Sequence, residues 1–286
     1  MIYITKVNGF KYAYAPCGFL LDYNNSDLIL KFTKAVKKYL SKKGIMAIKL
    51  NPMVIKSIYD PKNHNKEENL NYDSIFQALK QNKYFHMGYN NYFEALKPRF
   101  HAVVDMDRPY YMIFNHFKKE TRTKIRSAVK NGIHVYKGNE ENLEFLYSHT
   151  KEKYPRNFNY FKDCMKAFGR RNLIDYYYTK LNTEEYLKET KKNYDHLEEQ
   201  TAEINNQIKE AKQKQQEKLL NKKMKIDTEF AKIKKQLVYA TNLLREYPEG
   251  VITSSILVAR HQDEITVLID GYDKKFQSFN SKHRFL

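Results

Sequence analysis

Residues 187–244 read LKETKKNYDHLEEQTAEINNQIKEAKQKQQEKLLNKKMKIDTEFAKIKKQLVYATNLL, and no other segment of the chain says more about its architecture. Apolar and small side chains recur in it at alternating spacings of three and four residues, which is the seam of a coiled coil. Two such seams follow one another. The first comprises Leu187, Thr190, Tyr194, Leu197, Thr201, Ile204, Ile208 and Ala211, and the second comprises Ile226, Phe230, Ile233, Leu237, Ala240 and Leu244.

The two seams are out of phase. Extending the first by heptads reaches Lys218 and Lys225, so one continuous helix would turn an apolar stripe into water. Two helices folded back on each other would bury both stripes, and we therefore predict an antiparallel hairpin with its turn between Lys212 and Lys225. No Gly or Pro marks that turn, which leaves a single long helix paired with another chain as the alternative. Arms of about 25 to 30 residues would project roughly 40 Å.

The rest of the chain alternates predicted strands and helices. Before the helical stretch we expect strands at residues 10–14, 45–50, 100–106, 133–136 and 173–181 and helices at 26–44, 74–80, 117–131, 141–152 and 157–168, and after it strands at 252–259 and 264–269. The fold class is therefore mixed α/β (α+β). We predict a first domain over residues 1–106 and a second over 107–182 and 248–286, interrupted by a helical arm over 183–247.

Composition narrows the class of partner. The chain has 286 residues, and 51 Lys and Arg against 33 Asp and Glu give a formal net charge of +18. This excess favours RNA, phosphate-bearing substrates or an anionic membrane surface, although the abundance of Lys, Asn, Ile, Tyr and Phe is also typical of an AT-rich genome. Cys17 and Cys164 build no disulfide framework, and neither a signal-peptide pattern nor an apolar run of ~20 residues is present. We expect a cytoplasmic protein.

Catalytic signatures with a fixed pattern are absent from the sequence. It contains no P-loop, no G-x-G-x-x-G, no H-E-x-x-H and no nucleophile elbow. The Q/R-x-x-G-x-G/A loop that binds acetyl-CoA is missing too, which disfavours a small-molecule acetyltransferase. The nine histidines do not fall at ligand spacings, so we expect no metal and no cofactor, and we name no catalytic residue.

Arg156 and Tyr160 form the first candidate binding site. Residues four apart share one face of a helix, and a guanidinium fork beside a phenol can grip a phosphate or a pyrophosphate. An exposed arginine beside a tyrosine at the rim of the core has the same pattern and is commoner. The spacing alone leaves both interpretations open.

Two lysine-rich segments are further candidates. Between residues 209 and 225, seven lysines face only two glutamates, which suits a contact with a nucleic-acid backbone. The candidates for that contact are Lys218, Lys222, Lys223 and Lys225. The helix expected at residues 117–131 is basic as well. For both segments, a solvated surface explains the charge equally well.

Six segments, taken in order, resemble the FemABX family of aminoacyl-tRNA-dependent transferases, which build the peptide cross-bridges of peptidoglycan. They are residues 14–23 (YAPCGFLLDY), 48–52 (IKLNP), 97–105 (KPRFHAVVD), 122–133 (RTKIR with the VKNGI exit), 156–161 (RNFNYF, similar to the family's R-x-x-x-Y-F signature) and 270–279 (DGYDKKFQSF). Six matches in the family's order, with a helical hairpin in the right gap, are hard to reach by chance.

The resemblance implies two acetyltransferase (GNAT)-like domains with an antiparallel coiled-coil arm inserted in the second. Family members take an amino acid from its tRNA and join it to the side-chain amine of a peptidoglycan precursor, which is lipid-linked or nucleotide-linked. By position, Arg156 and Tyr160 would bind the phosphates of that precursor, and the lysine-rich tip of the arm would bind aminoacyl-tRNA. A lipid-linked precursor also implies a peripheral contact with the membrane surface. No metal or cofactor is implied.

The chain departs from the family's pattern in residues and in length. Cys17 stands where a basic residue is common, Phe19 replaces a proline, Asn51 replaces an aspartate, and Val267 and Leu268 replace tyrosines. We expect the family's first strands, with a further precursor-binding lysine, before Met1 and its catalytic centre after Leu286, so that both domains are incomplete here. The alternatives are an inactive fragment of such a transferase, and a non-catalytic coiled-coil protein that binds nucleic acid or acts as a scaffold.

Overall fold

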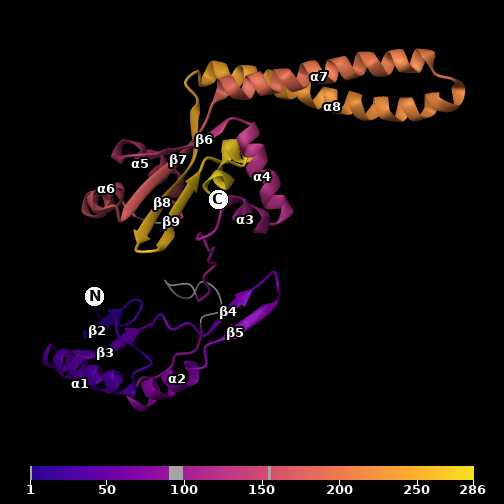
Figure 1. The fold of residues 1–286 in the computed structure, drawn as a ribbon. Helices are drawn as coiled ribbons and strands as arrows, with labels where there is room; N and C mark the ends of the chain where they lie inside the picture. The colour runs from indigo at the N-terminus through magenta and orange to yellow at the C-terminus, as the bar shows by residue number, and fades with distance from the viewer. Residues whose placement is uncertain (1, 90–98, 154–155) are drawn as a thin grey trace. The chain divides into compact units, whose positions relative to one another are not determined.

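The computed structural model describes residues 2–89, 99–153 and 156–286, so that part of the family match, residues 97–98, lies outside the described residues. The chain divides into two compact units, Met1–Val104 and Asp105–Leu286. Both units mix strands with helices, which confirms the predicted α/β class (Figure 1). Each unit has its own sheet.

The first unit is built on a three-stranded sheet. Its strands, in order across the sheet, are β1 (Tyr3–Val7), β2 (Phe10–Ala15) and β3 (Ile45–Leu50). β1 and β2 are antiparallel, whereas β2 and β3 are parallel and are joined through helix α1 (Ser26–Lys42). A parallel pair needs such a crossover, because the chain must return to the starting edge of the sheet.

Helix α1 covers one face of this sheet. The Asn25 side chain caps the helix by accepting a hydrogen bond from the Leu28 amide at 2.9 Å. Leu40 of α1 packs on Ala13 and Ile45 of the sheet, and these three residues form a small buried core. The unit is completed by a two-stranded hairpin and a second helix: β4 (Ser57–Asp60), β5 (Asn65–Glu68) and α2 (Tyr72–Gln81).

Four strands differ from the prediction. β1, β4 and β5 have no counterpart among the predicted strands, and all of their residues but Ser57 are exposed, so no buried face marks them in the sequence. The strand predicted at residues 100–106 is wrong, because these residues are exposed and have no regular structure. A strand needs a neighbour for its backbone hydrogen bonds, and an apolar run does not reveal whether one exists.

The second unit is built on a four-stranded antiparallel sheet. Its strands, in order across the sheet, are β6 (Ile133–Lys137), β7 (Ile174–Leu181), β8 (Val251–His261) and β9 (Glu264–Tyr272). Its regular helices outside the arm are α3 (Tyr110–His116), α4 (Lys119–Lys130), α5 (Leu143–Thr150) and α6 (Phe158–Phe168). Four short 3₁₀ helices complete the unit: Glu140–Asn142, Gly169–Arg171, Lys274–Phe279 and Ser281–Phe285.

Two hydrophobic clusters hold the helices of this unit on its sheet. Helices α5 and α6 contribute Leu143, Leu146 and Phe161, which pack on Tyr176 of β7 and Leu257 of β8, all 1% exposed or less. A second cluster joins α4 and the C-terminal 3₁₀ helices to the ends of β6 and β7. Its buried members are Ala128, Ile133, Leu181, Tyr186, Ala240, Leu243, Phe276 and Phe279.

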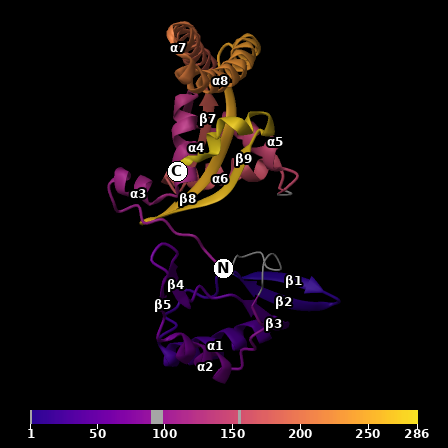
Figure 2. The same cartoon turned by 90° about the vertical axis from the view of Figure 1, so that its right-hand side faces the viewer.

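The heptad-patterned stretch of residues 187–244 folds as part of two helices, α7 (Thr183–Glu210) and α8 (Gln213–Glu246). They run side by side in opposite directions (Figures 1 and 2). Only Ala211 and Lys212 separate them, both in extended conformations with ψ of 140° and 152°. The single-helix alternative is therefore wrong, and the turn lies at the very start of the predicted window.

The seams predicted from the heptads face inward. All residues of the first and second seams are buried or half-buried, and the ring of Tyr194 lies 5.1 Å from that of Phe230. Leu243, which belongs to neither predicted seam, is also buried at 2% exposure because it packs into the base of the hairpin. The helices contain 28 and 34 residues, which corresponds to lengths of about 40 and 50 Å.

The hairpin is anchored where it leaves and rejoins the sheet, between the adjacent strands β7 and β8. The Thr183 hydroxyl donates to the Tyr247 carbonyl at 2.7 Å, which joins the two helix ends. Lys275 forms an ion pair with Glu246 at 2.7 Å, and this contact raises the pKa of the lysine. These bonds, the second cluster and the ion pair of Lys130 of α4 with Glu189 of α7 at 3.4 Å hold the base of the hairpin on the second unit.

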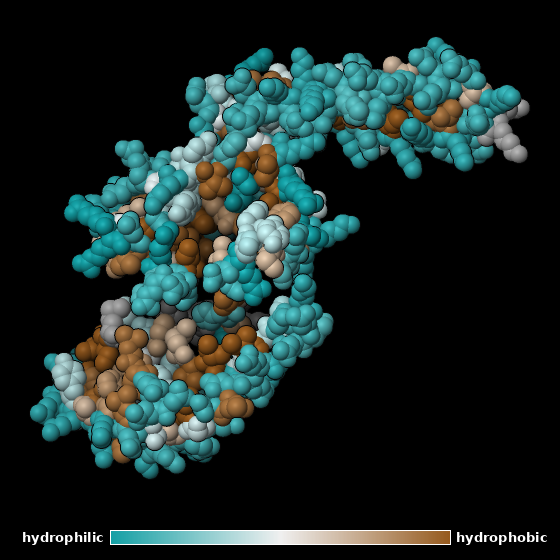
Figure 3. All heavy atoms as spheres, in the orientation of Figure 1, coloured by the Kyte–Doolittle hydropathy of each residue, from teal (hydrophilic) through white to brown (hydrophobic). Residues whose placement is uncertain are grey.

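Polarity differs sharply between the hairpin and the first unit. On the face that Figure 3 shows, the hairpin is mainly hydrophilic with a few apolar residues along it, whereas apolar residues are visible over much of the first unit. Examples of exposed apolar residues there are Ile4, Phe10 and Met46, each more than half exposed. Among the described residues, no helix combines the length and the apolar composition needed to cross a bilayer.

Candidate functional site

Arg156 and Tyr160 are in direct contact. The Arg156 Nη1 donates a hydrogen bond to the Tyr160 hydroxyl at 3.1 Å, and the guanidinium carbon lies 4.5 Å from the centre of the phenol ring. The expected shared helix face is wrong in detail, because α6 begins at Phe158 and Arg156 precedes it. Asn157 caps the helix by accepting from the Tyr160 amide at 2.9 Å. The spacing of four thus brings the two side chains together across a helix cap.

The start of α6 is held firmly in place. Phe161 is fully buried among the side chains of α5, β7 and β8, and its ring meets the neighbouring Tyr160 ring edge-on at 5.4 Å. Phe158 packs on Tyr147 of α5 at 5.5 Å. These contacts leave Arg156 exposed and Tyr160 38% exposed at the first turn of the helix.

This geometry suits an anion. The first amides of a helix carry partial positive charge, and a guanidinium beside them adds a full charge with planar donors. Arg156 uses one nitrogen for Tyr160, and its other donors can point to a phosphate. The cation–π contact with the phenol orients the guanidinium plane.

The four candidate lysines lie on α8 close to the turn. Lys218, Lys222 and Lys225 are exposed, whereas Lys223 is half-buried. Within the described part of the chain, none of the four has a carboxylate within the 4.0 Å of an ion pair. They are therefore available to an external anion. Arg156 comes two residues before α6, and Figure 1 shows α6 far from the turn between α7 and α8, so the structure does not bring these lysines near Arg156.

The hairpin's charge is divided between its two helices. α7 contains eight carboxylates and four lysines, a net charge of −4. α8 contains nine basic residues and four carboxylates, a net charge of +5. Sequence reasoning compared the tip with the stalk and missed this division, although the hairpin prediction together with the two compositions is enough to find it.

Asp175 is the centre of a polar network that the sequence does not reveal. Its carboxylate is buried and accepts from Lys137 at 2.6 Å and from Arg260 at 2.8 Å. The Asp175 carboxylate raises the pKa of Lys137. The three residues come from three adjacent strands, so strand pairing alone assembles them. Asp175 is paired with both cations through its two carboxylate oxygens, which marks the network as structural.

The described residues offer no metal site, and the buried phenol of Tyr176 is not a base. No group of three or more His, Cys, Asp or Glu within them could hold a metal ion. Burial raises the pKa of the Tyr176 phenol to about 12, and its hydroxyl donates to the Asn142 carbonyl at 2.9 Å. A phenol with that pKa stays protonated at neutral pH and cannot act as a base there.

A mixed α/β unit interrupted by a long helical hairpin, with an arginine–tyrosine pair at the head of a helix, is a distinctive combination. The sequence model of the FemAB family matches residues 1–284 of this chain. The chain belongs to the FemAB family.

Known relatives agree with this assignment. The lipid II:glycine glycyltransferase of Staphylococcus saprophyticus is 22% identical over 277 residues, which cover 94% of this chain and 62% of the relative. The aminoacyltransferase FemA of Staphylococcus epidermidis is 24% identical over 281 residues, covering 94% of this chain and 66% of the relative. The chain thus spans about two thirds of the length of these relatives.

A solved structure shares the fold. The crystal structure of FemX superposes with a TM-score of 0.69 at 21% sequence identity, and the match covers 99% of this chain and 70% of that chain. At this identity the likeness shows the fold alone.

Proposed function

We propose that this chain acts in the transfer of an amino acid from aminoacyl-tRNA to the side-chain amine of a peptidoglycan precursor. Membership of the FemAB family supports this function, as do relatives whose names specify glycine transfer to lipid II. In this reaction the amine nitrogen attacks the ester carbonyl that joins the amino acid to tRNA. The C–O ester bond breaks, an amide bond forms, and the proton lost by the amine neutralises the departing ribose oxygen.

The contact between Arg156 and Tyr160 is the observation that carries the proposal. A precursor linked to a lipid or to a nucleotide contains a pyrophosphate, and Arg156 at the helix start has guanidinium donors besides the one that it gives to Tyr160. We assign the pair to that pyrophosphate. Ester aminolysis needs positioning of the amine, removal of its proton and stabilisation of an oxyanion, but no metal or cofactor.

The lysines near the hairpin turn support a role in tRNA binding. In this proposal the two helices pack as a coiled coil, inserted in the second of two acetyltransferase-like domains, and Lys218, Lys222, Lys223 and Lys225 contact RNA phosphates. The domain limits proposed from the sequence, 1–106, 107–182, 183–247 and 248–286, go with it. The protein would work in the cytoplasm at the inner membrane surface, where a lipid-linked precursor is accessible.

Precursor binding tests the assignment of Arg156. The binding constant of a nucleotide-linked muropeptide would be measured by calorimetry for the present chain and for Arg156→Lys, which keeps the charge but loses the planar fork. We expect a loss of about 1.5–3 kcal/mol, the range of a hydrogen bond to a charged group. Arg171→Lys, at an exposed arginine beyond the far end of α6, is the matched control. Equal affinities of Arg156→Lys, Arg156→Ala and the unchanged chain would refute the phosphate role.

A further inference from the structure

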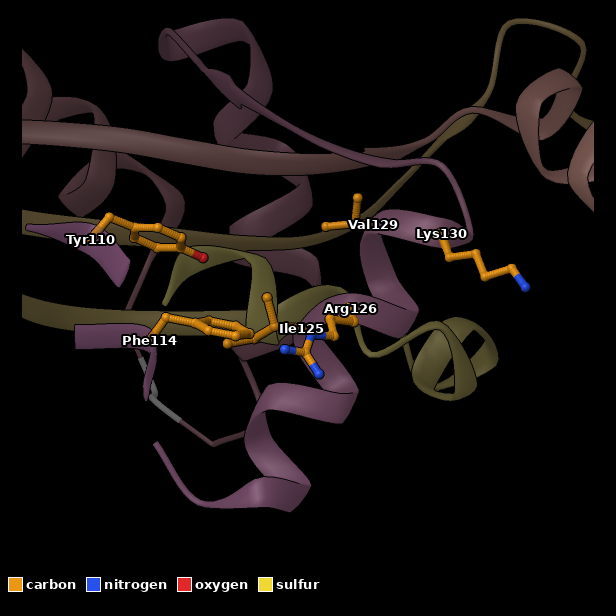
Figure 4. A pocket seen from close by; sticks show the side chains of 6 residues that line it. All are labelled: Tyr110, Phe114, Ile125, Arg126, Val129 and Lys130. Carbon is orange, nitrogen blue, oxygen red and sulfur yellow. The ribbon is translucent and has the colours of Figure 1, made fainter. Parts of the chain in front are cut away.

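Helices α3 and α4 enclose a shallow apolar groove. It has a volume of about 290 Å³ and is lined by Tyr110 and Phe114 of α3 and by Ile125, Arg126, Val129 and Lys130 of α4. Figure 4 shows the two rings on one side and the α4 side chains on the other. Apart from the two charged groups and one phenol, these side chains present carbon to the groove.

Several large apolar side chains of these two helices are exposed. Tyr110 and Tyr111 are 60% and 65% exposed, Val129 is 52% exposed and Met112 is 39% exposed. In the same two helices, Ile113 and Ile125 are buried at 6% and 3%. The helices therefore have a complete inner face and a second apolar face that remains in solvent.

One face of α4 is also strongly cationic. Lys119, Arg122, Arg126 and Lys130 lie at positions i, i+3, i+7 and i+11, which places them on one side of a helix. Glu120 is on another side and is paired with Lys124 at 2.6 Å. Among the described residues, no carboxylate lies within the 4.0 Å of an ion pair from Lys119, Arg122 or Arg126.

We propose that the α3–α4 face docks on a bilayer that contains anionic phospholipids. Peripheral proteins bind at the boundary between lipid headgroups and acyl chains with cationic side chains that lie beside aromatic and aliphatic ones. The cations meet the lipid phosphates, and tyrosines favour this boundary because their rings are apolar and their hydroxyls polar. The inference deepens the proposed function and rests on it for its purpose, since a lipid-linked precursor lies in such a bilayer.

RNA fits this face less well than lipid. Stacking on bases needs open ring faces, but the Arg126 guanidinium lies 5.2 Å from the centre of the Phe114 ring and Tyr110 lies 5.9 Å from it. The side chains of Val129 and Met112 have no group that could form a hydrogen bond or an ion pair with the phosphates of RNA. An acyl chain, in contrast, gains from each of these side chains.

Vesicle binding tests the proposal with the chain as it exists. Sedimentation with vesicles of phosphatidylglycerol and phosphatidylcholine would be compared with vesicles of phosphatidylcholine alone. Removing two cations with Arg122→Gln/Arg126→Gln should weaken binding to the anionic vesicles about 25-fold, from about 1 kcal/mol per basic residue near the surface. Because Arg126 packs on Phe114, the pair Lys119→Gln/Arg122→Gln is a second variant that leaves the groove intact and should show a similar loss.

Matched controls separate the surface from general charge and polarity. Lys34→Gln/Lys38→Gln removes the same charge from the exposed side of α1. Tyr111→Ser should weaken vesicle binding about fivefold, because it removes about 40 Å² of apolar surface at about 25 cal/mol/Å². The control Tyr39→Ser, at a tyrosine that is 57% exposed on α1, should leave vesicle binding unchanged. All variants should keep the melting temperature of the unchanged chain.

Three outcomes would overturn the proposal. The first is equal binding to neutral and anionic vesicles, and the second is an equal loss of binding in the α4 and α1 variants. The third is competition by inorganic phosphate at constant ionic strength, because this would indicate a phosphate site only. Binding of duplex RNA that depends on Arg122 in place of vesicle binding would assign the face to nucleic acid. The water-soluble nucleotide-linked precursor should bind the α4 variants normally, so failure here is distinguishable from failure at Arg156.

Discussion

At the scale of single residues, Tyr160 contacts Arg156 through two different parts of its side chain. The hydroxyl accepts a hydrogen bond and the ring faces the guanidinium. Tyr160→Phe removes only the hydroxyl, so we expect precursor affinity to fall by about 0.5–1.5 kcal/mol, less than for Arg156→Ala. Calorimetry with the nucleotide-linked precursor measures this, and Tyr39→Phe on α1 is the control. A loss as large as that of Arg156→Ala would mean that the phenol contacts the ligand itself.

His283 makes the stability of the second unit depend on pH. Burial lowers the pKa of its imidazole, nearby Lys124 and Lys282 lower it further, and Glu120 opposes them. Its Nδ1 is buried without a hydrogen-bond partner among the described residues. Because the unfolded chain binds the proton more readily, the free energy of unfolding should be highest above about pH 6.5 and fall as the pH drops toward the lowered pKa.

Denaturant titrations between pH 5 and 7.5 measure this dependence. His283→Gln removes the titrating group, so the free energy of unfolding should vary less with pH in the variant than in the unchanged chain. The same slope in both would show that other groups cause the dependence.

Residues far apart in sequence set the limit of prediction at this scale. Arg156 and Tyr160 are four apart, and local geometry suffices to predict their contact even though the helix starts between them. Lys137, Asp175 and Arg260 meet only because β6, β7 and β8 pair in a particular register. Nothing in the sequence fixes that register, so the network could not be predicted.

At the scale of elements, the hairpin was the best predicted part, because the apolar heptad positions in its sequence are the positions that are buried between its two helices. The two out-of-phase seams require a break, and the structure has one. The position of the break was harder to predict, since Ala211 and Lys212 adopt extended conformations that any residue can adopt and need no glycine. The failed strand at residues 100–106 shows the converse, that β propensity without a neighbouring strand does not make a sheet.

The division of charge between α7 and α8 leads to a prediction about RNA. Replacing Lys218, Lys222 and Lys225 by Gln should weaken tRNA binding and reduce the salt dependence, by about 0.7–0.9 in the slope of log K against log salt for each lost phosphate contact. The matched control removes the same charge from the acidic helix, with Lys188, Lys191 and Lys192 replaced by Gln. Filter binding at several salt concentrations measures both. Equal effects of the two triple variants would show that net charge alone attracts the RNA.

At the scale of the whole molecule, the two units differ in how well their apolar residues are covered. The second unit has two large clusters, whereas the compact core of the first centres on Ala13, Leu40 and Ile45. Leu20, Leu70 and Phe85 of the first unit are each at least 88% exposed. Sequence patterns predict which face of an element is apolar but not what covers it, and this difference could therefore not be predicted.

Because the hairpin is built of regular heptads, its length can be changed in steps of one heptad per helix. Tyr194 lies against Phe230, so residues 191–197 of α7 lie opposite residues 227–233 of α8. Deleting both segments removes one heptad from each helix, keeps both apolar stripes in phase and leaves the tip lysines in place. The pair contains three basic residues and three carboxylates, so net charge is unchanged.

The double deletion should stay folded and carry its tip about 10 Å closer to the sheet. Deleting residues 191–197 alone leaves a heptad of α8 without a partner and should lower the melting temperature measured by circular dichroism. If the lysines hold tRNA at a fixed distance from the precursor, the shortened protein should keep its affinity for isolated tRNA but lose the ability to bind tRNA and precursor together. Simultaneous binding that survives the loss of both heptads would mean that the arm is a flexible tether. Loss of simultaneous binding would instead mean that the hairpin fixes the distance between the tRNA and the precursor, and that this distance changes in steps of one heptad.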